Sequence, residues 1–430
     1  MTRLGASQIP SPLRLSTVRG DAIADYVTED TRVLACIELS QRAGVDSALA
    51  FEKAGPRPQI FFDPSTVHAA LLTAGGLCPG INNVIRSIVL ELYHRYGVRH
   101  ISGIRYGYEG LNPETGLPPV ELGPDDVKHI HGWGGSELGV GRGAQDVDMM
   151  AARLEELGVN VLFTIGGDGT LRGAHQIHEA LERRGHKVAV VGVPKTVDND
   201  IAFVDKTFGF DTAIEVARQA LTAGHTEALS ARNGVGLVRL MGRDAGFITA
   251  HAALASNDVN FCLVPELPFV LHGEGGLLHA LEERLARRDH ALIAVAEGCA
   301  RQLIGSVVRD ASGNASYSSE ASDVGPLMRD AIVRHFRERG LPLTLKYIDP
   351  SYMIRSVPAN ASDSRLADSL ARHAVHAAMA GKTDLVIGFV NSAFVHVPLT
   401  LATSRERRLN LDGELWLAVT SATGQPPLTG

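Results

Sequence analysis

Residues 161–170 read VLFTIGGDGT, an apolar strand followed at once by a glycine-rich turn that contains one aspartate. Thirty residues later the apolar run KVAVVGV is followed by a second acidic turn, PKTVDND, residues 194–200. Near-continuous Val, Ile and Leu strands that alternate with helices are typical of parallel sheets covered on both faces. In such sheets ligands bind beyond the carboxyl ends of the strands. The sequence therefore predicts an α/β fold with a charged ligand at these turns.

The composition is that of a globular protein longer than one hydrophobic core. The chain has 430 residues, 45% hydrophobic and 21% charged, and two α/β domains are expected at this length. A formal charge of −7 argues against nucleic-acid binding, and no apolar run approaches the ~20 residues that cross a bilayer. The four cysteines are scattered without a CxxC pair, which indicates a reducing compartment, and we expect a cytoplasmic protein.

Hydrophobic periodicity predicts two successive series of strands and helices. The first has strands at 67–73, 159–165 and 187–193 and helices at 84–96, 144–158 and 175–185. The second has helices at 211–224 and 275–288 and strands at 234–240, 261–266 and 291–298. Residues 1–65 are expected to form an extension that is partly helical around 45–52. The Ser-rich segment 310–323 is an expected loop, and the run 384–390 is expected to return to a sheet edge.

Three glycine-rich segments follow predicted strands: TAGGLCPGINN (73–83), IGGDGT (165–170) and GVPKTVDND (192–200). Backbone amides at glycine turns and helix N-termini can hold phosphate oxygens where a Cβ atom would obstruct them. Asp168 suits such a place if Mg²⁺ lies between its carboxylate and a phosphate, because that ion prefers hard oxygen ligands. The alternative is that these segments are tight turns with aspartate caps.

The segment PKTVDND adds a group that phosphoryl transfer requires. Transfer to a hydroxyl needs positioning, charge neutralisation and a carboxylate that accepts the hydroxyl proton. Asp198 and Asp200 are candidates for that base, although each could instead cap a helix or form a turn.

Taken together with further segments of the chain, these motifs resemble those of the 6-phosphofructokinase family. The matching segments occur in the family's order from Thr73 to Arg355: TAGGLCPGINN, GGSELGVGRG, IGGDGTLRGA, PKTVDND, TFGFDTA, LMGRDAGF, AEG and KYIDPSYMIR. The resemblance implies two Rossmann-like three-layer α/β/α domains with mainly parallel sheets and an active site between them, in a homodimer or homotetramer. It implies a nucleotide-binding domain at 66–205, completed by part of the C-terminal segment 356–430, and a sugar-phosphate-binding domain at 206–355.

The resemblance also implies a role for each matching residue. Asp198 would be the general base towards the 1-hydroxyl of fructose 6-phosphate, supported by Thr196 and Asp200. Asp168 would hold Mg²⁺, and Arg142 would neutralise the transferring phosphoryl group. The other residues expected to bind ATP are Gly76, Gly143, Gly167, Gly169, Thr170 and Lys195. Those expected to bind the sugar are Tyr108, Met241, Gly242, Arg243 and Glu297, with Lys346, Tyr352 and Arg355 at its 6-phosphate. Taken alone, Arg243 or Arg355 would suit a surface ion pair and Met241 a core position.

Departures from the compact bacterial enzymes point to the plant and pyrophosphate-related branch of the family. Lys195 stands where those enzymes have glycine, Tyr352 replaces a histidine and Lys346 replaces an arginine. A subunit-crossing arginine is replaced by Gly234, with Arg232 as a nearby substitute. The allosteric effector sites of the compact enzymes are therefore not expected here.

Gly169 favours ATP over pyrophosphate, because pyrophosphate-dependent members carry aspartate there, in the space of the nucleotide α-phosphate. Lys195 favours pyrophosphate instead, since a lysine at its position also serves pyrophosphate binding. Two more alternatives are a kinase of the NAD or diacylglycerol type, which leaves PKTVDND unexplained, and a phosphosugar-binding regulatory subunit without catalysis. Degenerate copies usually lose the base or metal aspartate, whereas both are present here.

Overall fold

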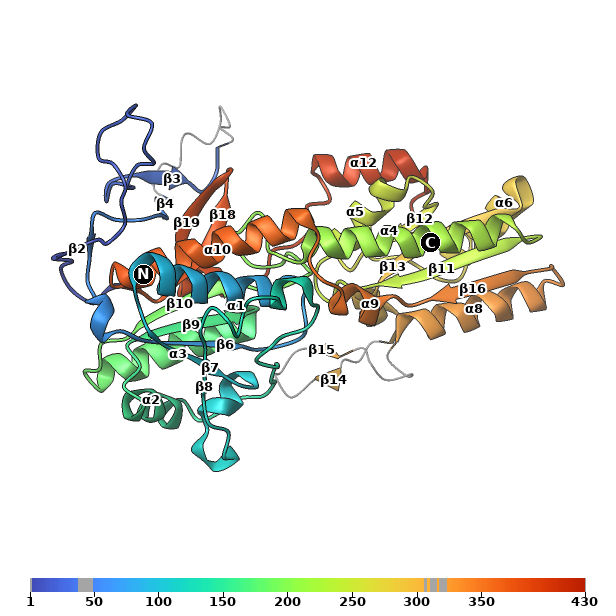
Figure 1. Ribbon diagram of the computed structural model, residues 1–430. Coiled ribbons are helices and arrows are strands. Elements are labelled where there is room, and N and C mark those ends of the chain that lie inside the picture. The colour runs from blue at the N-terminus through green and yellow to red at the C-terminus, as the bar shows by residue number, and fades with distance from the viewer. Residues whose placement is uncertain (1, 38–48, 305–307, 310–314, 317–322, 430) are drawn as a thin grey trace. The chain divides into compact units, whose positions relative to one another are not determined.

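The computed structural model describes residues 2–37, 49–304, 308–309, 315–316 and 323–429 (Figure 1). By its contacts the chain forms two compact units. Unit 1 comprises Met1–Thr196, Ile201–Gly209 and Ser356–Glu406, and unit 2 comprises Val197–Asp200, Phe210–Arg355 and Arg407–Gly430. Residues 1–65, for which the sequence predicts an N-terminal extension, fall in unit 1, and the predicted C-terminal segment 356–430 is divided between the two units.

Unit 1 is built on a nine-stranded mixed sheet with the order β3-β4-β19-β18-β10-β9-β6-β7-β8. The strands are β3 (Arg32–Leu34), β4 (Ala50–Lys53), β6 (His68–Thr73), β7 (His100–Ile104), β8 (Val120–Glu121), β9 (Val161–Gly166), β10 (Ala189–Pro194), β18 (Leu385–Val390) and β19 (Ala393–Pro398). The five central strands, β18 to β7, are parallel, and the strands on either side of them pair antiparallel. Outside this sheet β1 (Thr2–Arg3) pairs with β17 (Lys382–Thr383), and β2 (Ile9–Pro10) pairs with β5 (Gln59–Ile60).

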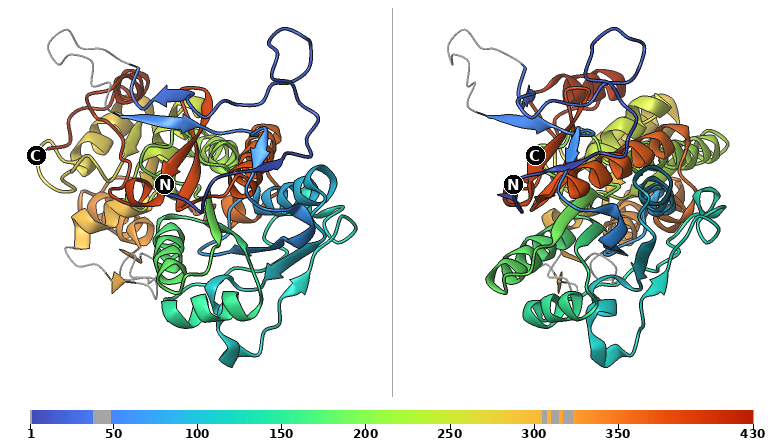
Figure 2. Two further views of the ribbon diagram at one scale, coloured as in Figure 1. Left: turned by 90° about the vertical axis from the view of Figure 1, so that its left-hand side faces the viewer. Right: turned by 60° about the vertical axis from the view of Figure 1, so that its left-hand side comes forward.

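Helices cover both faces of this sheet (Figures 1 and 2). On one face lie α1 (Ile81–Leu90), which continues as a π-helix over Glu91–Tyr96, and α10 (Ala361–Met379); on the other lie α2 (Val147–Glu156), α3 (Asp168–Arg183) and α11 (Leu399–Ala402). Helix α3 buries Leu171, Ala174, Ile177 and Leu181, which recur at helical spacing and pack against the sheet. Short 3₁₀ helices form at Pro64–Thr66, Gly107–Leu111, Pro113–Thr115 and Ile130–Gly132.

Unit 2 is a second α/β layer structure, and its four-stranded sheet is fully parallel, in the order β12-β13-β11-β16. The strands are β11 (Gly234–Leu240), β12 (Phe261–Leu263), β13 (His290–Ala296) and β16 (Thr344–Ile348). The long helices α4 (Phe210–Leu229) and α5 (Phe247–Ser256) pack together on one side, while α6 (Leu277–Arg288) and α8 (Val324–Glu338) complete the apolar core on the other. The remaining elements are a 3₁₀ turn at Glu297–Cys299, α7 (Ala300–Ile304), β14 (Val308–Arg309), β15 (Ala315–Ser316), α9 (Ser351–Ser356) and α12 (Glu414–Thr423).

The predicted α/β class is confirmed, but three local predictions are wrong. Residues 50–52 of the expected helix 45–52 lie in strand β4, because they pair with β3, and Glu52 also pairs with β19; residues 45–48 lie outside the described residues. The run 384–390 forms β18 inside the sheet, because β19, β4 and β3 extend the sheet beyond it. Helix α3 begins at Asp168 instead of residue 175, so the GGDGT segment forms its first turn.

Other expectations from the sequence concern the cysteines, membrane-spanning helices and the Ser-rich segment. All four cysteines lie in the described part, and none of them forms a disulfide. Across the described ranges, the structure contains no helix with the length and apolar character needed to cross a bilayer. Most of the Ser-rich segment 310–323 lies outside the described residues.

A buried ion network ties the N-terminal residues into unit 1. Glu52 on β4 is 2% exposed and accepts from Arg57 at 2.8 Å, and it also pairs with Lys382 of β17. Glu29 contacts the same two cations, at 2.9 Å from Arg57 and 3.1 Å from Lys382. Burial lowers the pKa of Lys382 to about 8 although Glu29 acts in the opposite direction.

Glu52→Gln is expected to destabilise the protein by about 3–5 kcal/mol, because it removes the buried carboxylate and leaves the two buried cations with the half-exposed Glu29 as their remaining partner in this network. Denaturant unfolding of the two proteins at pH 7 measures this difference. Glu156→Gln is the matched control, since Glu156 pairs with Arg153 at an exposed position where such pairs contribute about 0–1 kcal/mol. Equal stability losses in the two variants would contradict the proposed importance of the network.

Candidate active site

The glycine-rich turns of unit 1 meet at the carboxyl ends of β6, β9 and β10. The amide of Gly75 donates to the carbonyl of Gly141 at 2.9 Å, and the amide of Lys195 donates to the carbonyl of Gly166 at 3.0 Å. The structure therefore brings together the segments that the sequence placed after successive strands. Their backbone amides and the N-terminus of α3 form the kind of surroundings that hold phosphate groups.

The glycines at the start of α3 differ in the space that their surroundings leave for a side chain. A Cβ atom on Gly166 would lie 2.2 Å from Oγ1 of the buried Thr170, and one on Gly167 would lie 3.3 Å from the carbonyl oxygen of Lys195. These two positions are restricted by the packing of the turn. A Cβ atom on Gly169, in contrast, would meet nothing within 4 Å. The fold tolerates a side chain at residue 169, so steric packing does not explain this glycine.

Asp168 is the first residue of α3, directly after the N-cap residue Gly167. Its carboxylate is 25% exposed and forms an ion pair with Arg172 one turn along the helix. No group of three or more His, Cys, Asp and Glu side chains that could hold a metal occurs in the described ranges. Mg²⁺ is usually held by one or two carboxylates together with substrate phosphates and water, so a single carboxylate beside a phosphate-binding turn fits this ion.

Lys195 extends into the first glycine turn. The side chain is buried, and its Nζ donates to the carbonyl of Gly76 at 2.7 Å. The next residue, Thr196, accepts a hydrogen bond from Oγ1 of Thr207 at its carbonyl oxygen, at 2.7 Å. The loop that leads to Asp198 is thus fixed on the unit 1 side by contacts of two consecutive residues.

The other predicted residues of unit 1 lie around these turns. Arg142 is exposed and directly follows Gly141, and Gly143 adopts a left-handed conformation with φ +110°. Tyr108 was expected to contact the sugar. In the structure its hydroxyl donates to the carbonyl of Thr170 at 2.5 Å, so it supports the first turn of α3.

The loop that carries Asp198 belongs to unit 2 and is held by the C-terminal segment. The Arg407 amide donates to the carbonyl of Asp200 at 2.8 Å, and its guanidinium donates to the carbonyl of Asn199 at 3.2 Å. Asn199 has a positive φ of 55°, which asparagine tolerates better than most residues. The guanidinium of Arg407 also lies over the ring of Phe247, 4.7 Å from its centroid.

Asp198 is buried and interacts electrostatically with several charged side chains. Burial raises its pKa well above the usual value, and the neighbouring carboxylates of Asp200 and Glu297 raise it further, while Arg243 acts in the opposite direction. Burial opposes the charged form of Arg243, but the hydrogen bond to Asp244 and the charges of Asp198 and Asp200 raise its pKa above the usual value. A carboxylate whose pKa is raised in this way accepts a proton more readily than an ordinary aspartate.

The segment after β11 places the predicted sugar residues Met241, Gly242 and Arg243. Met241 is 9% exposed. Gly242 has φ +123°, and a Cβ atom there would lie 2.6 Å from the carbonyl oxygen of Ala245, so only glycine fits this turn. Arg243 Nε donates to Asp244 at 2.7 Å, which orients its guanidinium.

Glu297 follows the neighbouring strand β13, and its carboxylate accepts from Arg239 at 2.7 Å. Arg239 was missed by the sequence analysis, although a single arginine inside the apolar strand GVGLVRL was the available signal. Tyr352 and Arg355 lie on α9, which follows β16, with the Arg355 guanidinium 5.2 Å from the centroid of the Tyr352 ring. The tyrosine side chain is largely exposed. These residues follow three adjacent strands at the same edge of the sheet.

Lys346 does not join this group. It lies inside β16, where it pairs with Gly236, and its Nζ is 3.8 Å from a carboxylate oxygen of Glu227 near the end of α4. The predicted contact of Lys346 with the 6-phosphate therefore has no support from the arrangement of unit 2.

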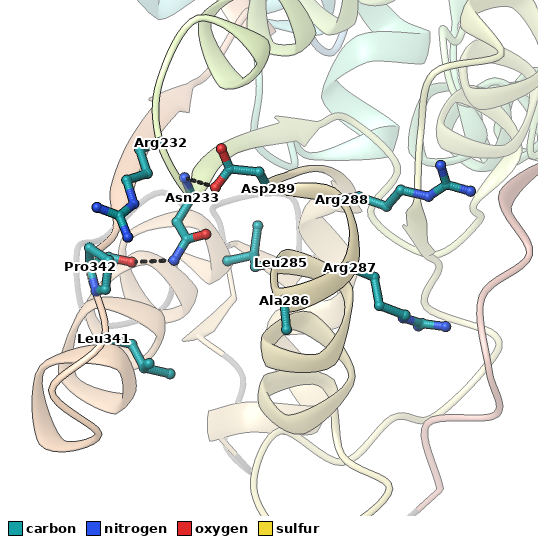
Figure 3. Close-up of a pocket in the computed structure, with 9 residues that line it drawn as sticks. All are labelled: Arg232, Asn233, Leu285, Ala286, Arg287, Arg288, Asp289, Leu341 and Pro342. Carbon is teal, nitrogen blue, oxygen red and sulfur yellow. Dashed lines mark hydrogen bonds between the residues drawn. The ribbon is translucent and has the colours of Figure 1, made fainter.

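A pocket of about 610 Å³ lies at the opposite end of β11 (Figure 3). It is lined by Arg232, Asn233, Leu285, Ala286, Arg287, Arg288, Asp289, Leu341 and Pro342, none of which was predicted as a ligand residue. Arg232, the suggested substitute for the missing arginine, precedes the first residue of β11, whereas Met241 follows the last. The 7 residues of β11, at about 3.3 Å each, separate the two by about 23 Å.

The chain is similar to known proteins in sequence and in fold. Residues 68–378 match the family described as Phosphofructokinase. An ATP-dependent 6-phosphofructokinase of Borreliella burgdorferi is 50% identical over 383 residues, 87% of this chain and 85% of the relative. The ATP-dependent 6-phosphofructokinase of Amycolatopsis methanolica is 44% identical over 98% of this chain and 94% of its own length.

A solved structure of a pyrophosphate-dependent phosphofructokinase from Marinobacter aquaeolei shares the fold. Its TM-score is 0.67 at 20% identity, with 85% of this chain and 92% of that chain covered. At this identity the likeness concerns the fold alone. Together with the matched profile and the two relatives above, these findings show that the chain belongs to the phosphofructokinase family.

Proposed function

We propose that this protein transfers the γ-phosphoryl group of ATP to the 1-hydroxyl of fructose 6-phosphate and so forms fructose 1,6-bisphosphate in glycolysis. The observation that carries the proposal is the placement of Asp198 among Asp200, Arg243 and Glu297 at the ligand-binding end of the unit 2 sheet. The relatives from Borreliella burgdorferi and Amycolatopsis methanolica, which bear the name ATP-dependent 6-phosphofructokinase, support it.

In this mechanism Asp198 accepts the proton of the 1-hydroxyl as the oxygen attacks phosphorus. Its raised pKa makes the carboxylate a better base than an ordinary aspartate. Arg243, Glu297 and Arg355 bind the sugar phosphate, because guanidinium groups suit a phosphate dianion and a carboxylate accepts from sugar hydroxyls. Arg142 neutralises charge that develops on the transferring group.

The glycine turns and Lys195 would bind the phosphates of ATP, and Asp168 would hold Mg²⁺ beside them. When bound, the ion would neutralise part of the phosphate charge. Arg172 must release the Asp168 carboxylate, at least in part, for this ligation. Because Thr196 is followed within two residues by Asp198, the chain passes directly from the nucleotide residues to the base. We further propose that the protein is a cytoplasmic homodimer or homotetramer.

The donor assay tests the proposal most directly. Purified protein with fructose 6-phosphate and Mg²⁺ is supplied either with ATP or with pyrophosphate, and formation of fructose 1,6-bisphosphate is measured. We expect turnover with ATP to exceed turnover with pyrophosphate. Faster turnover with pyrophosphate would overturn the donor assignment, and sugar phosphate binding without turnover from either donor would overturn the catalytic one.

The pH dependence of kcat/KM for fructose 6-phosphate is expected to show an acid limb from Asp198. The carboxylate must be ionised to accept a proton, so activity falls as the pH drops through its raised pKa, above the usual value of about 3.9. Asp200→Asn removes a negative neighbour that raises this pKa and should therefore move the limb to lower pH. The exposed Glu274, replaced by glutamine, is the control. An unmoved limb in the Asp200 variant would mean that another group titrates.

A further inference from the structure

Arg239 is a buried charge that the proposed mechanism does not use. It is the next-to-last residue of β11, and only 7% of its side chain is exposed between the apolar residues Val238 and Leu240. Transfer of an ionised group out of water costs free energy unless partners surround it. The partners of Arg239 therefore indicate why a charge stands at this point of the sheet.

The guanidinium of Arg239 contacts residues from three other parts of unit 2. It donates to Glu297 at 2.7 Å, to Asp349 at 3.0 Å and to the hydroxyl of Ser351 at 2.8 Å. Its Nε lies 3.3 Å from the carboxylate of Asp323. Three carboxylates thus share one cation, and the planar fork of arginine can serve all of them at once where a lysine could not.

Two of these contacts, with Asp349 and Ser351, lie at the start of the helix that carries Tyr352 and Arg355. The Asp349 carboxylate accepts from the Ser351 amide at 2.9 Å and from its hydroxyl at 2.5 Å, which fixes the start of α9. Because Arg239 binds both Asp349 and Ser351, the first turn of α9 is tied to β11.

The contact with Glu297 affects the protonation and the orientation of a side chain that is predicted to bind the sugar. Burial raises the pKa of Glu297, and Arg239 opposes this more strongly than Arg243 or Arg355 does. Without Arg239 the Glu297 carboxyl would be protonated more readily and would lose the hydrogen bonds that fix its orientation. Glu297 would then present a hydroxyl donor to the sugar in place of two acceptor oxygens.

We propose that Arg239 is a positioning residue for fructose 6-phosphate: it holds the Glu297 carboxylate and the first turn of α9 in one arrangement. The groups for the hexose ring and for the 6-phosphate are then presented together. The proposal rests on the proposed function, because it concerns the same sugar phosphate. It assigns to Arg239 no contact with the substrate itself.

The network also contains an arm that serves only the fold, and this provides a matched control. Asp323 is the N-cap residue of α8 and accepts from the Gly325 amide at 2.9 Å. Asparagine caps a helix as well as aspartate does, so Asp323→Asn removes a charge beside Arg239 and keeps the cap. A purely structural role of Arg239 would make this variant resemble Arg239→Met.

The test is a double-mutant cycle on fructose 6-phosphate binding, measured by calorimetry and by KM. Since a hydrogen bond to a charged group contributes about 1.5–3 kcal/mol, we expect Arg239→Met to raise the Kd and KM for the sugar about 10- to 100-fold, with kcat within about threefold. The Kd for ATP should not change. In a Glu297→Gln background the same change should weaken sugar binding by a clearly smaller factor than in the wild type, because only the contacts with the start of α9 remain to be lost. Asp323→Asn should leave sugar binding within about twofold of the wild type.

Arg239→Lys keeps the buried positive charge and serves if the methionine variant does not fold. We expect it to raise the Kd for the sugar by less than the methionine change would, and to leave ATP binding unaltered. Unchanged sugar binding in both Arg239 variants would overturn the proposal, as would an equal loss in the Asp323 variant or full additivity with Glu297→Gln. A wild-type protein that binds ATP and not fructose 6-phosphate would instead overturn the proposed function.

Discussion

Replacement of Asp198 by asparagine is expected to lower kcat by about 10²–10⁴-fold, the usual contribution of a general base. The amide keeps the shape of the side chain and cannot accept the hydroxyl proton. Because the carboxylate acts mainly as the oxygen attacks phosphorus, the Kd for fructose 6-phosphate should change much less than kcat. Steady-state rates with ATP, together with calorimetric sugar binding, measure the two effects separately.

Stability provides the control for this variant. The pKa of Asp198 is raised by burial and by the neighbouring carboxylates of Asp200, Glu297 and Asp244, so its ionised form disfavours the folded state at neutral pH. Asp198→Asn removes that charge and should leave the unfolding midpoint unchanged or higher. Lost activity in a protein of equal or greater stability is the signature of a functional residue. Turnover near that of the wild type would exclude Asp198 as the base.

Gly169→Asp is expected to abolish ATP-dependent activity while sugar phosphate binding is kept. The structure has room for the side chain, since a Cβ atom at this position meets nothing within 4 Å. An aspartate in the first turn of α3 also favours the helix through its dipole. The fold should therefore survive, and the loss should come from repulsion: two like charges at 4 Å repel by about 4 kcal/mol at an effective dielectric constant of 20.

Gly169→Ala is the matched variant, because it adds the Cβ atom without the charge. Alanine is favoured over glycine inside a helix by about 1 kcal/mol, so this protein should be slightly more stable than the wild type. We expect it to keep most of the kcat/KM for ATP, whereas the aspartate variant should lose at least about 100-fold. Comparable ATP activity in the two variants would show that charge at residue 169 does not select the donor.

The meeting of the glycine-rich turns of unit 1 was predictable because it follows from the order of the chain. Turns that follow neighbouring parallel strands must meet at one edge of the sheet, and this placed Asp168, Gly169 and Lys195 together without knowledge of any side-chain contact. The hydrogen bonds of Lys195 to Gly166 and to Gly76 are the physical outcome of that rule.

The surroundings of Arg239 and Lys346 could not be predicted in this way. Three carboxylates reach Arg239 only because β13, β16 and the start of α8 meet around β11, and sequence spacing does not encode that meeting. The face on which Lys346 lies depends on the pleat of β16: Lys346 approaches Glu227 of α4, whereas the ring of Tyr347 lies beside Gly325 of α8.

The conformation of strand β4 could not be predicted from the sequence either. Residues 50–53 are too few for hydrophobic periodicity to distinguish a strand from a helix. Their conformation is set by pairing with β19, in which Glu52 lies opposite His396, a residue more than three hundred positions later in the chain. Long-range pairing of this kind overrides a weak local preference.

Both units take essential parts from the last 75 residues of the chain, 356–430. Strand β18, which pairs with β10 in the interior of the unit 1 sheet, is among them, and so is Arg407, which holds the loop of Asp198. A ribosome that adds about 5–20 residues per second needs roughly 4–15 s to produce this stretch. During that time the growing polypeptide exposes the open edge of β10 and lacks the arginine that holds the loop of Asp198, so chaperone protection matters most while residues 356–430 are being added.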